Sequence, residues 1–89
     1  MNLPEHIAKI IIERLELEGF DAQTFPKDML LFAPDEHGGL GLDSLASLEI
    51  IAGLSTEFSL PFDDVAEDDF HTVNTLAAYV ERKKKEQAP

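Results

Sequence analysis

The sequence predicts an all-α fold: a small bundle of three main helices plus a short one, with a long first loop. Three segments place apolar residues at the spacing of a helix that is buried on one side. No segment shows the alternation typical of a half-buried strand, and prolines and glycines gather between the periodic segments. A chain of 89 residues can bury one small core, so we expect a single domain over residues 1–89.

The first helix is predicted over residues 4–18. Isoleucines and leucines recur there at mostly helical spacing, and charged side chains occupy the other side. Pro4 suits the first turn of a helix and Gly19 suits its end, and these two residues set the predicted limits.

A long connection is predicted over residues 20–42, because five prolines and glycines interrupt any period there. A loop of this length is uncommon in a compact domain and indicates either a missed element or a functional segment. We expect its apolar side chains to fasten it across the helices, with one short turn near residues 27–31. These side chains are Phe20, Phe25, Met29, Leu30, Leu31, Phe32, Leu40 and Leu42.

The second helix is predicted over residues 44–58 and carries two apolar arcs. At about 100° per residue, the first arc holds Ile50, Ile51, Leu54 and Phe58, and the second holds Leu45, Leu48 and Ala52. Gly53 in the middle costs about 1 kcal/mol of helix propensity relative to alanine. We interpret this glycine as a sign of close approach by a neighbouring helix or of room for a ligand.

The last two helices are predicted over residues 63–69 and 72–85. Asp63 or Asp64 would cap the short helix, and Thr72 would cap the long one. The final turn of the long helix holds four cations at residues 82–85, which complement the helix dipole. Its predicted buried stripe consists of Val73, Leu76, Ala77 and Val80.

The chain is strongly acidic, with a net charge of −11, and residues 1–81 hold 17 acidic against three basic side chains. Such a surface repels nucleic acid and anionic lipid and steers the protein toward basic partners, although solubility alone also explains it. The absence of cysteine excludes disulfides and thiolate metal sites. No signal peptide or membrane-spanning segment is indicated, so we expect a cytoplasmic protein that is monomeric.

Ser44 needs the most explanation, because it starts the second helix in the stretch "GLGLDSLASLEI". A hydrolase elbow requires glycines two residues before and after the serine, but Leu42 and Ala46 occupy those positions. The three histidines fall in separate segments, and the acidic run over residues 63–69 lacks the spacing of a calcium loop. Two interpretations remain open from the residues. Asp43 caps the helix and Ser44 is simply its first residue, or the helix N-terminus tolerates a phosphate ester on Ser44.

The longer stretch "GLGLDSLASLEIIAGLSTEF" resembles the phosphopantetheine attachment site of acyl carrier proteins. The Asp-Ser-Leu of that family stands at residues 43–45, and its glutamate five residues after the serine is Glu49. Its helix-closing pair is Glu57 and Phe58, and "FHTVNTLAAYV" resembles the start of its last helix. The likeness covers nearly the whole chain and implies an acyl-carrier-like four-helix bundle.

The resemblance implies a discrete acyl carrier protein that is not itself an enzyme. A phosphopantetheinyl transferase would move 4'-phosphopantetheine from coenzyme A onto Ser44 with magnesium, and the thiol of the arm would hold acyl groups as thioesters. This explains why the chain has no cysteine and why Ser44 has no base beside it. Acyl-transfer and condensing enzymes with basic patches would be the other partners.

The resemblance also implies a partner surface on the second helix. Three acidic residues would pair with basic patches and three apolar residues would dock beside the arm: Asp43, Glu49 and Glu57, and Leu45, Leu48 and Ala52. For the leucines, ordinary packing against the first loop is the alternative.

The sequence indicates the class of cargo only in part. If the second and the short helix part to shelter an acyl chain, the pocket candidates are Ile50, Gly53, Leu54, Phe58, Phe62 and Val65. The second helix is less acidic than in fatty-acid carriers, which favours polyketide-type or specialised-lipid assembly over housekeeping fatty acid synthesis. An aminoacyl or peptidyl carrier is the near alternative, and an unmodified acidic adaptor for a basic partner is the distant one.

Overall fold

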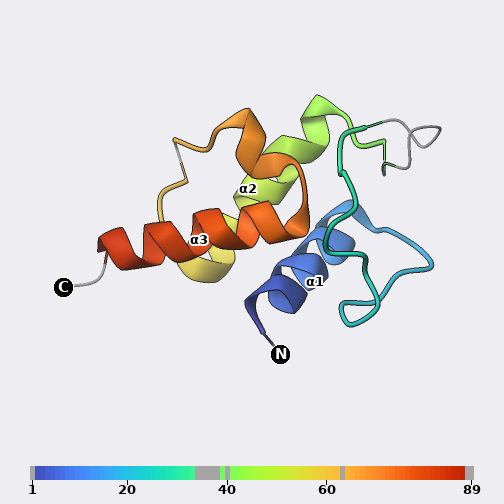
Figure 1. The fold of residues 1–89 in the computed structure, drawn as a ribbon, viewed down its shortest axis with the longest axis horizontal. Helices are drawn as coiled ribbons and strands as arrows, with labels where there is room; N and C mark the ends of the chain where they lie inside the picture. Colours follow the sequence, from blue (N-terminus) through green and yellow to red (C-terminus); the bar gives the residue numbers. More distant parts are fainter. Residues whose placement is uncertain (1, 34–38, 40, 63, 88–89) are drawn as a thin grey trace.

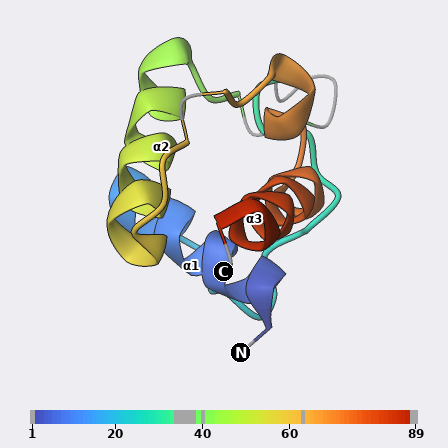
Figure 2. The ribbon, with the colours of Figure 1, turned by 90° about the vertical axis from the view of Figure 1, so that its left-hand side faces the viewer.

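The computed structural model describes residues 2–33, 39, 41–62 and 64–87, and within these ranges the chain is all-α, as predicted. Three α-helices and one short 3₁₀-helix follow one another in the order α1, α2, η2, α3 (Figure 1). Figure 2 shows α2 on one side of the molecule and η2 with α3 on the other, while α1 crosses at their base.

Helix α1 comprises Leu3–Leu15 and is shorter than predicted. At its start the Asn2 side chain accepts the backbone N–H of Glu5 at 2.9 Å. The helix stops before the predicted residue 18 because Glu16 adopts a left-handed conformation with φ of 52°. The N–H of Leu17 then bonds back to the carbonyl of Ile12 at 3.0 Å, and this turn brings Leu17 against the core.

Helix α2 comprises Ser44–Phe58, and a cap fixes each of its ends. Asp43 is extended, and its carboxylate accepts the N–H of Ala46 at 3.0 Å. At the other end Ser59 takes a left-handed conformation with φ of 54°, which ends the helix and turns the chain toward α3.

The short helix differs from its prediction over residues 63–69. It is the 3₁₀-helix η2, Glu67–Phe70. It begins later because the Asp69 carboxylate accepts the N–H of Ala66 at 2.9 Å. Asp64, one of the two predicted caps, is instead bonded to α3, and the other, Asp63, lies outside the described residues.

Helix α3 comprises Val73–Gln87. Thr72 and Thr75 cap its start reciprocally, each hydroxyl accepting the backbone N–H of the other at 3.0–3.1 Å, which confirms the predicted role of Thr72. The prediction that residues 82–85 form the final turn is right only for Lys84 and Lys85, because α3 continues to Gln87. The Lys83 side chain is 8% exposed, and its ammonium lies 3.2 Å from a carboxylate oxygen of Asp64.

The core lies between the three α-helices and receives two side chains from the first loop, Phe25 and Leu31, which are fully buried. The prediction that apolar residues fasten this loop is confirmed for these two and for four others that pack partly buried against the core: Phe20, Met29, Phe32 and Leu42. It is wrong for Leu30, which is exposed, and Leu40 lies outside the described residues.

Backbone hydrogen bonds dock the first loop onto the start of α3. The N–H of Leu31 donates to the carbonyl of His71 at 2.8 Å, and the N–H of Asn74 donates to the carbonyl of Lys27 at 3.1 Å. The ammonium of Lys27 also binds the carbonyls of Ala22 and Phe25 at 2.9 and 2.8 Å, which closes the loop on itself. The described part of the loop is therefore fixed against the helices, and none of its described residues belongs to a helix.

Candidate functional site

Ser44 is the first residue of α2, directly after its cap. Its side chain lies outside the described part of the structure. Its neighbours Asp43 and Leu45 are exposed, so the surroundings of this position are accessible to a second protein. The start of α2 combines unpaired N–H groups with the positive end of the helix dipole and therefore tolerates an anion.

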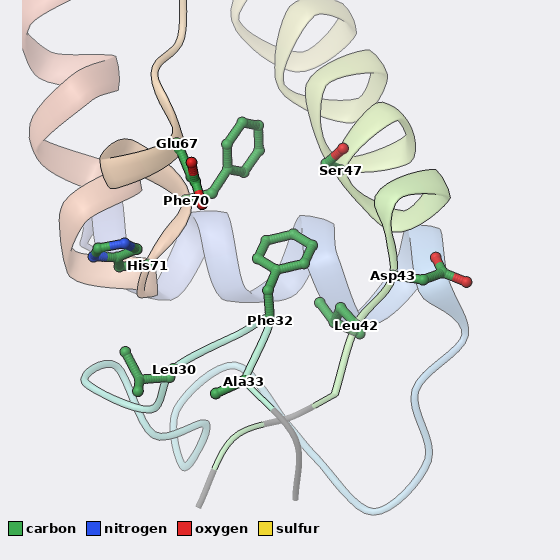
Figure 3. Close-up of a pocket in the computed structure, with 9 residues that line it drawn as sticks. All are labelled: Leu30, Phe32, Ala33, Leu42, Asp43, Ser47, Glu67, Phe70 and His71. Carbon is green, nitrogen blue, oxygen red and sulfur yellow. The ribbon is translucent and has the colours of Figure 1, made fainter. Parts of the chain in front are cut away.

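A cleft with a volume of about 670 Å³ opens beside this helix start (Figure 3). We call it the α2–η2 cleft. Asp43 and Ser47 line it from α2, and Glu67, Phe70 and His71 line it from η2 and the residue that follows. The first loop supplies the remaining wall through Leu30, Phe32, Ala33 and Leu42.

The lining of the α2–η2 cleft is apolar in the middle and polar at both sides. Phe32 and Phe70 form an edge-to-face pair with ring centroids 5.8 Å apart and ring planes at 87°. Both rings are half-buried. In Figure 3 they lie between Asp43 and Ser47 on one side and His71 on the other.

The described histidines do not form a catalytic triad with the start of α2. The ring of His6 lies 2.8 Å from the carboxylate of Glu57, at the opposite end of this helix. The ring of His71 lies 3.6 Å from the carboxylate of Asp68, and Figure 3 places it across the cleft from Asp43. His37 lies outside the described residues. A nucleophile would need a base within hydrogen-bond reach.

Sequence comparison identifies the family of this chain. Residues 35–80 match the family described as "Phosphopantetheine attachment site", which is more than half of the chain. The chain belongs to this family. Its members carry a covalent 4'-phosphopantetheine group and do not catalyse reactions themselves, so this chain is a carrier.

Two curated relatives of this carrier illustrate the range of the family. It is 36% identical over 67 residues to "Acyl carrier protein, mitochondrial" of Neurospora crassa, covering 72% of the chain but only about half, 47%, of that relative. It is 29% identical over 85 residues to "Acyl carrier protein" of Buchnera aphidicola, covering 92% of both chains. No solved structure gives a significant match. In the described part of the carrier, no helix is both long and apolar enough to span a membrane.

The residues around the start of α2 fit a phosphopantetheine arm. Its phosphodiester is an anion, and the helix start favours one. The mostly apolar α2–η2 cleft, which Asp43 and Ser47 border, offers space beside the attachment segment for the rest of the group. No group of three or more metal-ligating side chains occurs among the described residues.

All six residues predicted to meet partners are exposed, and five of them lie at the start or on the outward side of α2, whereas Glu57 lines the groove beside α1. Leu45 and Leu48 are 69% and 66% exposed, so packing against the first loop does not explain these leucines. Glu57 lies at the far end of the helix, where His6 of α1 already pairs with it. Asp43, Glu49 and Ala52 complete the surface. We call these six residues the α2 face.

The six predicted acyl-pocket residues line neither wall of the α2–η2 cleft. Ile50, Leu54 and Phe62 are buried in the core, and Phe58 and Val65 pack partly buried against it. Gly53 faces α1 instead: a Cβ at this position would lie 2.7 Å from the Cγ2 of Ile10. Of the two explanations for this glycine, the structure shows close approach of a neighbouring helix.

The cleft residues Phe32, Phe70 and Ser47 are the part of the site that the sequence did not reveal. Phe32 was assigned only to fastening the loop, and Phe70 was given no role. The available signal was the presence of an aromatic residue in the first loop, Phe32, and of another shortly before α3, Phe70. This signal acquires meaning only when folding brings the two segments together.

A second polar cluster fixes the segment that leads from α2 to η2. The hydroxyl of Tyr79 donates to the Asp64 carboxylate at 2.6 Å, and the Lys83 ammonium lies 3.2 Å from it. The Tyr79 hydrogen bond and then Lys83 hold the pKa of Asp64 below its usual range, while the hydrogen bond to Asp64 raises the pKa of Lys83. Asp64 therefore ties the connection before η2 to α3.

Proposed function

We propose that this chain is a discrete acyl carrier that receives its 4'-phosphopantetheine arm on the hydroxyl of Ser44 and delivers acyl thioesters to biosynthetic enzymes. The observation that carries the proposal is the position of Ser44 at the capped start of α2, between an exposed Asp43 and an exposed Leu45 and inside the matched attachment region. Two relatives that bear the name acyl carrier protein support acyl cargo over aminoacyl cargo.

The chain supplies position and recognition in this proposal. The start of α2 presents the hydroxyl and stabilises the phosphodiester formed there, and the α2 face meets the transferase and later enzymes. When bound, the group supplies a thiol that holds the acyl chain as a thioester. Few acidic residues lie on α2, which carries none in its first turn, and this favours polyketide-type or specialised-lipid partners.

Intact-mass spectrometry tests the proposal directly. We expect incubation with coenzyme A, magnesium and a broad-specificity phosphopantetheinyl transferase to add the mass of one arm, and fragmentation to locate it on Ser44. Ser44→Ala should abolish the addition, while Ser55→Ala, on the same helix, should retain it. An addition that survives Ser44→Ala, or no addition to the unaltered chain, would contradict the proposal and leave an acidic adaptor as the remaining interpretation.

A further inference from the structure

The α2–η2 cleft has the size of a site for a small organic group. Its volume of about 670 Å³ falls within the range typical of small-molecule pockets. It adjoins the start of α2, so a group attached at Ser44 starts at one of its walls. The cleft is thus the described cavity nearest to the cargo that the proposed function requires.

Large apolar side chains fill the described core beneath this cleft. Leu31, Ile50 and Leu54 are fully buried. The absent side chain of Gly53 leaves no room either, because Ile10 and Arg14 of α1 fill its place. A long saturated chain would therefore have to part packed side chains, and close-packed interiors resist such displacement.

The middle of the cleft is aromatic on two sides. Phe32 comes from the first loop and Phe70 from η2, and their rings meet edge to face while each stays half-buried. Aromatic rings prefer edge-to-face and offset contacts and gain from them beyond the area that they bury. A flat conjugated group entering here would add a third member to this cluster, whereas a saturated chain of equal size would gain only buried area.

We infer that the α2–η2 cleft selects, among the acyl cargoes of the proposed function, short groups that end in an aromatic or conjugated system. This inference rests on the proposed function, since it requires a loaded arm at Ser44. Phe32 and Phe70 are the specificity-determining residues. Polar side chains on both sides of the ring pair, Ser47 on one and His71 on the other, leave the apolar contact zone short.

The test compares forms of the carrier loaded from different coenzyme A thioesters. The arm alone, hexanoyl, hexadecanoyl and cinnamoyl forms are prepared with the same transferase, verified by mass, and melted. We expect the cinnamoyl form to melt several degrees above the arm-only form and above the other two acyl forms. Phe70→Leu keeps an apolar side chain and should remove the cinnamoyl advantage. Phe20→Leu takes one ring from the pair Phe20–Phe25, which does not line the cleft, and should preserve it.

A second measurement on the unaltered chain covers the case in which Phe70→Leu does not fold. Nuclear Overhauser contacts between cinnamoyl ring protons and the rings of Phe32 and Phe70 are expected. Equal melting of all acyl forms, or contacts to neither ring, would overturn the inference. A larger shift for the hexadecanoyl form would also overturn it and favour the predicted sheltering among Ile50, Leu54 and Phe62. If none of the forms gained the mass of an arm, the proposed function itself would be refuted.

Discussion

Gly53 lies buried where α2 passes α1, and its missing side chain sets how closely the two helices approach. We expect Gly53→Ala to lower the free energy of unfolding by about 1 kcal/mol, measured by urea denaturation. A gain of about 1 kcal/mol in helix propensity is outweighed by an overpacking cost of about 2 kcal/mol. The cost arises because the new Cβ would meet Ile10 Cγ2 at 2.7 Å and Arg14 Cγ at 3.0 Å.

The partner residue provides the control for this substitution. In an Ile10→Ala background the obstructing methyl group is gone, so Gly53→Ala should cost less there than in the unaltered chain. If Gly53→Ala stabilised the unaltered chain, α1 would have to yield at this contact, and the glycine would need another explanation.

Asp64 is one of the residues whose ionisation links stability to pH. Its folded-state pKa is lowered by Tyr79 and Lys83, so its contribution is fully present above its unfolded pKa, near 4. That contribution is lost as pH falls through the lowered folded value. We expect Asp64→Asn to be less stable than the unaltered chain at pH 7, with the difference shrinking below about pH 4. Urea unfolding at a series of pH values measures this.

Lys83, the basic partner of Asp64, links stability to pH at the alkaline end of the same series of measurements. The pKa of Lys83 is raised, so its contribution is present below its unfolded value and is lost as pH rises through the raised one. Asp68→Asn serves as the control, because the Asp68 side chain is almost fully exposed and pairs only at 3.6 Å with His71. A difference between Asp64→Asn and the unaltered chain that did not change with acid would contradict an ionic role for Asp64.

At the scale of elements, the α2 face combines exposed leucines with the carboxylates of a helix whose inner side belongs to the core. Leu48 is 66% exposed and packs against no core residue. We expect Leu48→Ala to change the free energy of unfolding by less than about 0.5 kcal/mol. It should reduce the kcat/KM of the phosphopantetheinyl transferase about tenfold, because an apolar contact of about 1.4 kcal/mol is lost from the complex.

Thr56→Ala is the matched control on the same helix. Thr56 is exposed but lies beside α1, in the groove that Gly53 and Arg14 border. Its truncation should leave the transferase reaction unchanged. Equal effects of the two substitutions, or a loss of stability with Leu48→Ala, would indicate that the leucine supports the fold and not the complex.

At the scale of the whole molecule, features set within one helical turn could be predicted from the sequence. Features set by contacts between distant segments could not. The start of α2 could be predicted because Asp43 and the residues after it act within one turn. The end of α1 could not, because Glu16 turns left-handed to bring Leu17 onto a core made by other elements. The sequence likewise predicts a terminal cation at Lys83, although this side chain is buried and bound to a carboxylate 19 residues earlier, that of Asp64.

The candidate site also contains residues that a local pattern predicts and residues that only folding brings together. Helical period places Leu45 and Leu48 on a separate arc from Ile50 and Leu54. Their exposure agrees with the docking role that the resemblance implies and not with packing against the first loop. The α2–η2 cleft joins Phe32, Phe70 and Ser47 from three segments, and no local pattern places these residues together. The cleft forms only because the first loop docks onto the start of α3.

Leu31 connects the docked first loop to the segments that precede α2 and α3. Its N–H is bonded to the carbonyl of His71 just before α3, and its own carbonyl accepts the N–H of Leu42 just before α2 at 3.0 Å. The buried residue Leu31 is therefore bonded to the segments that precede both α2 and α3. We expect the starts of these two helices to stay together, so any separation between them should be larger toward their far ends.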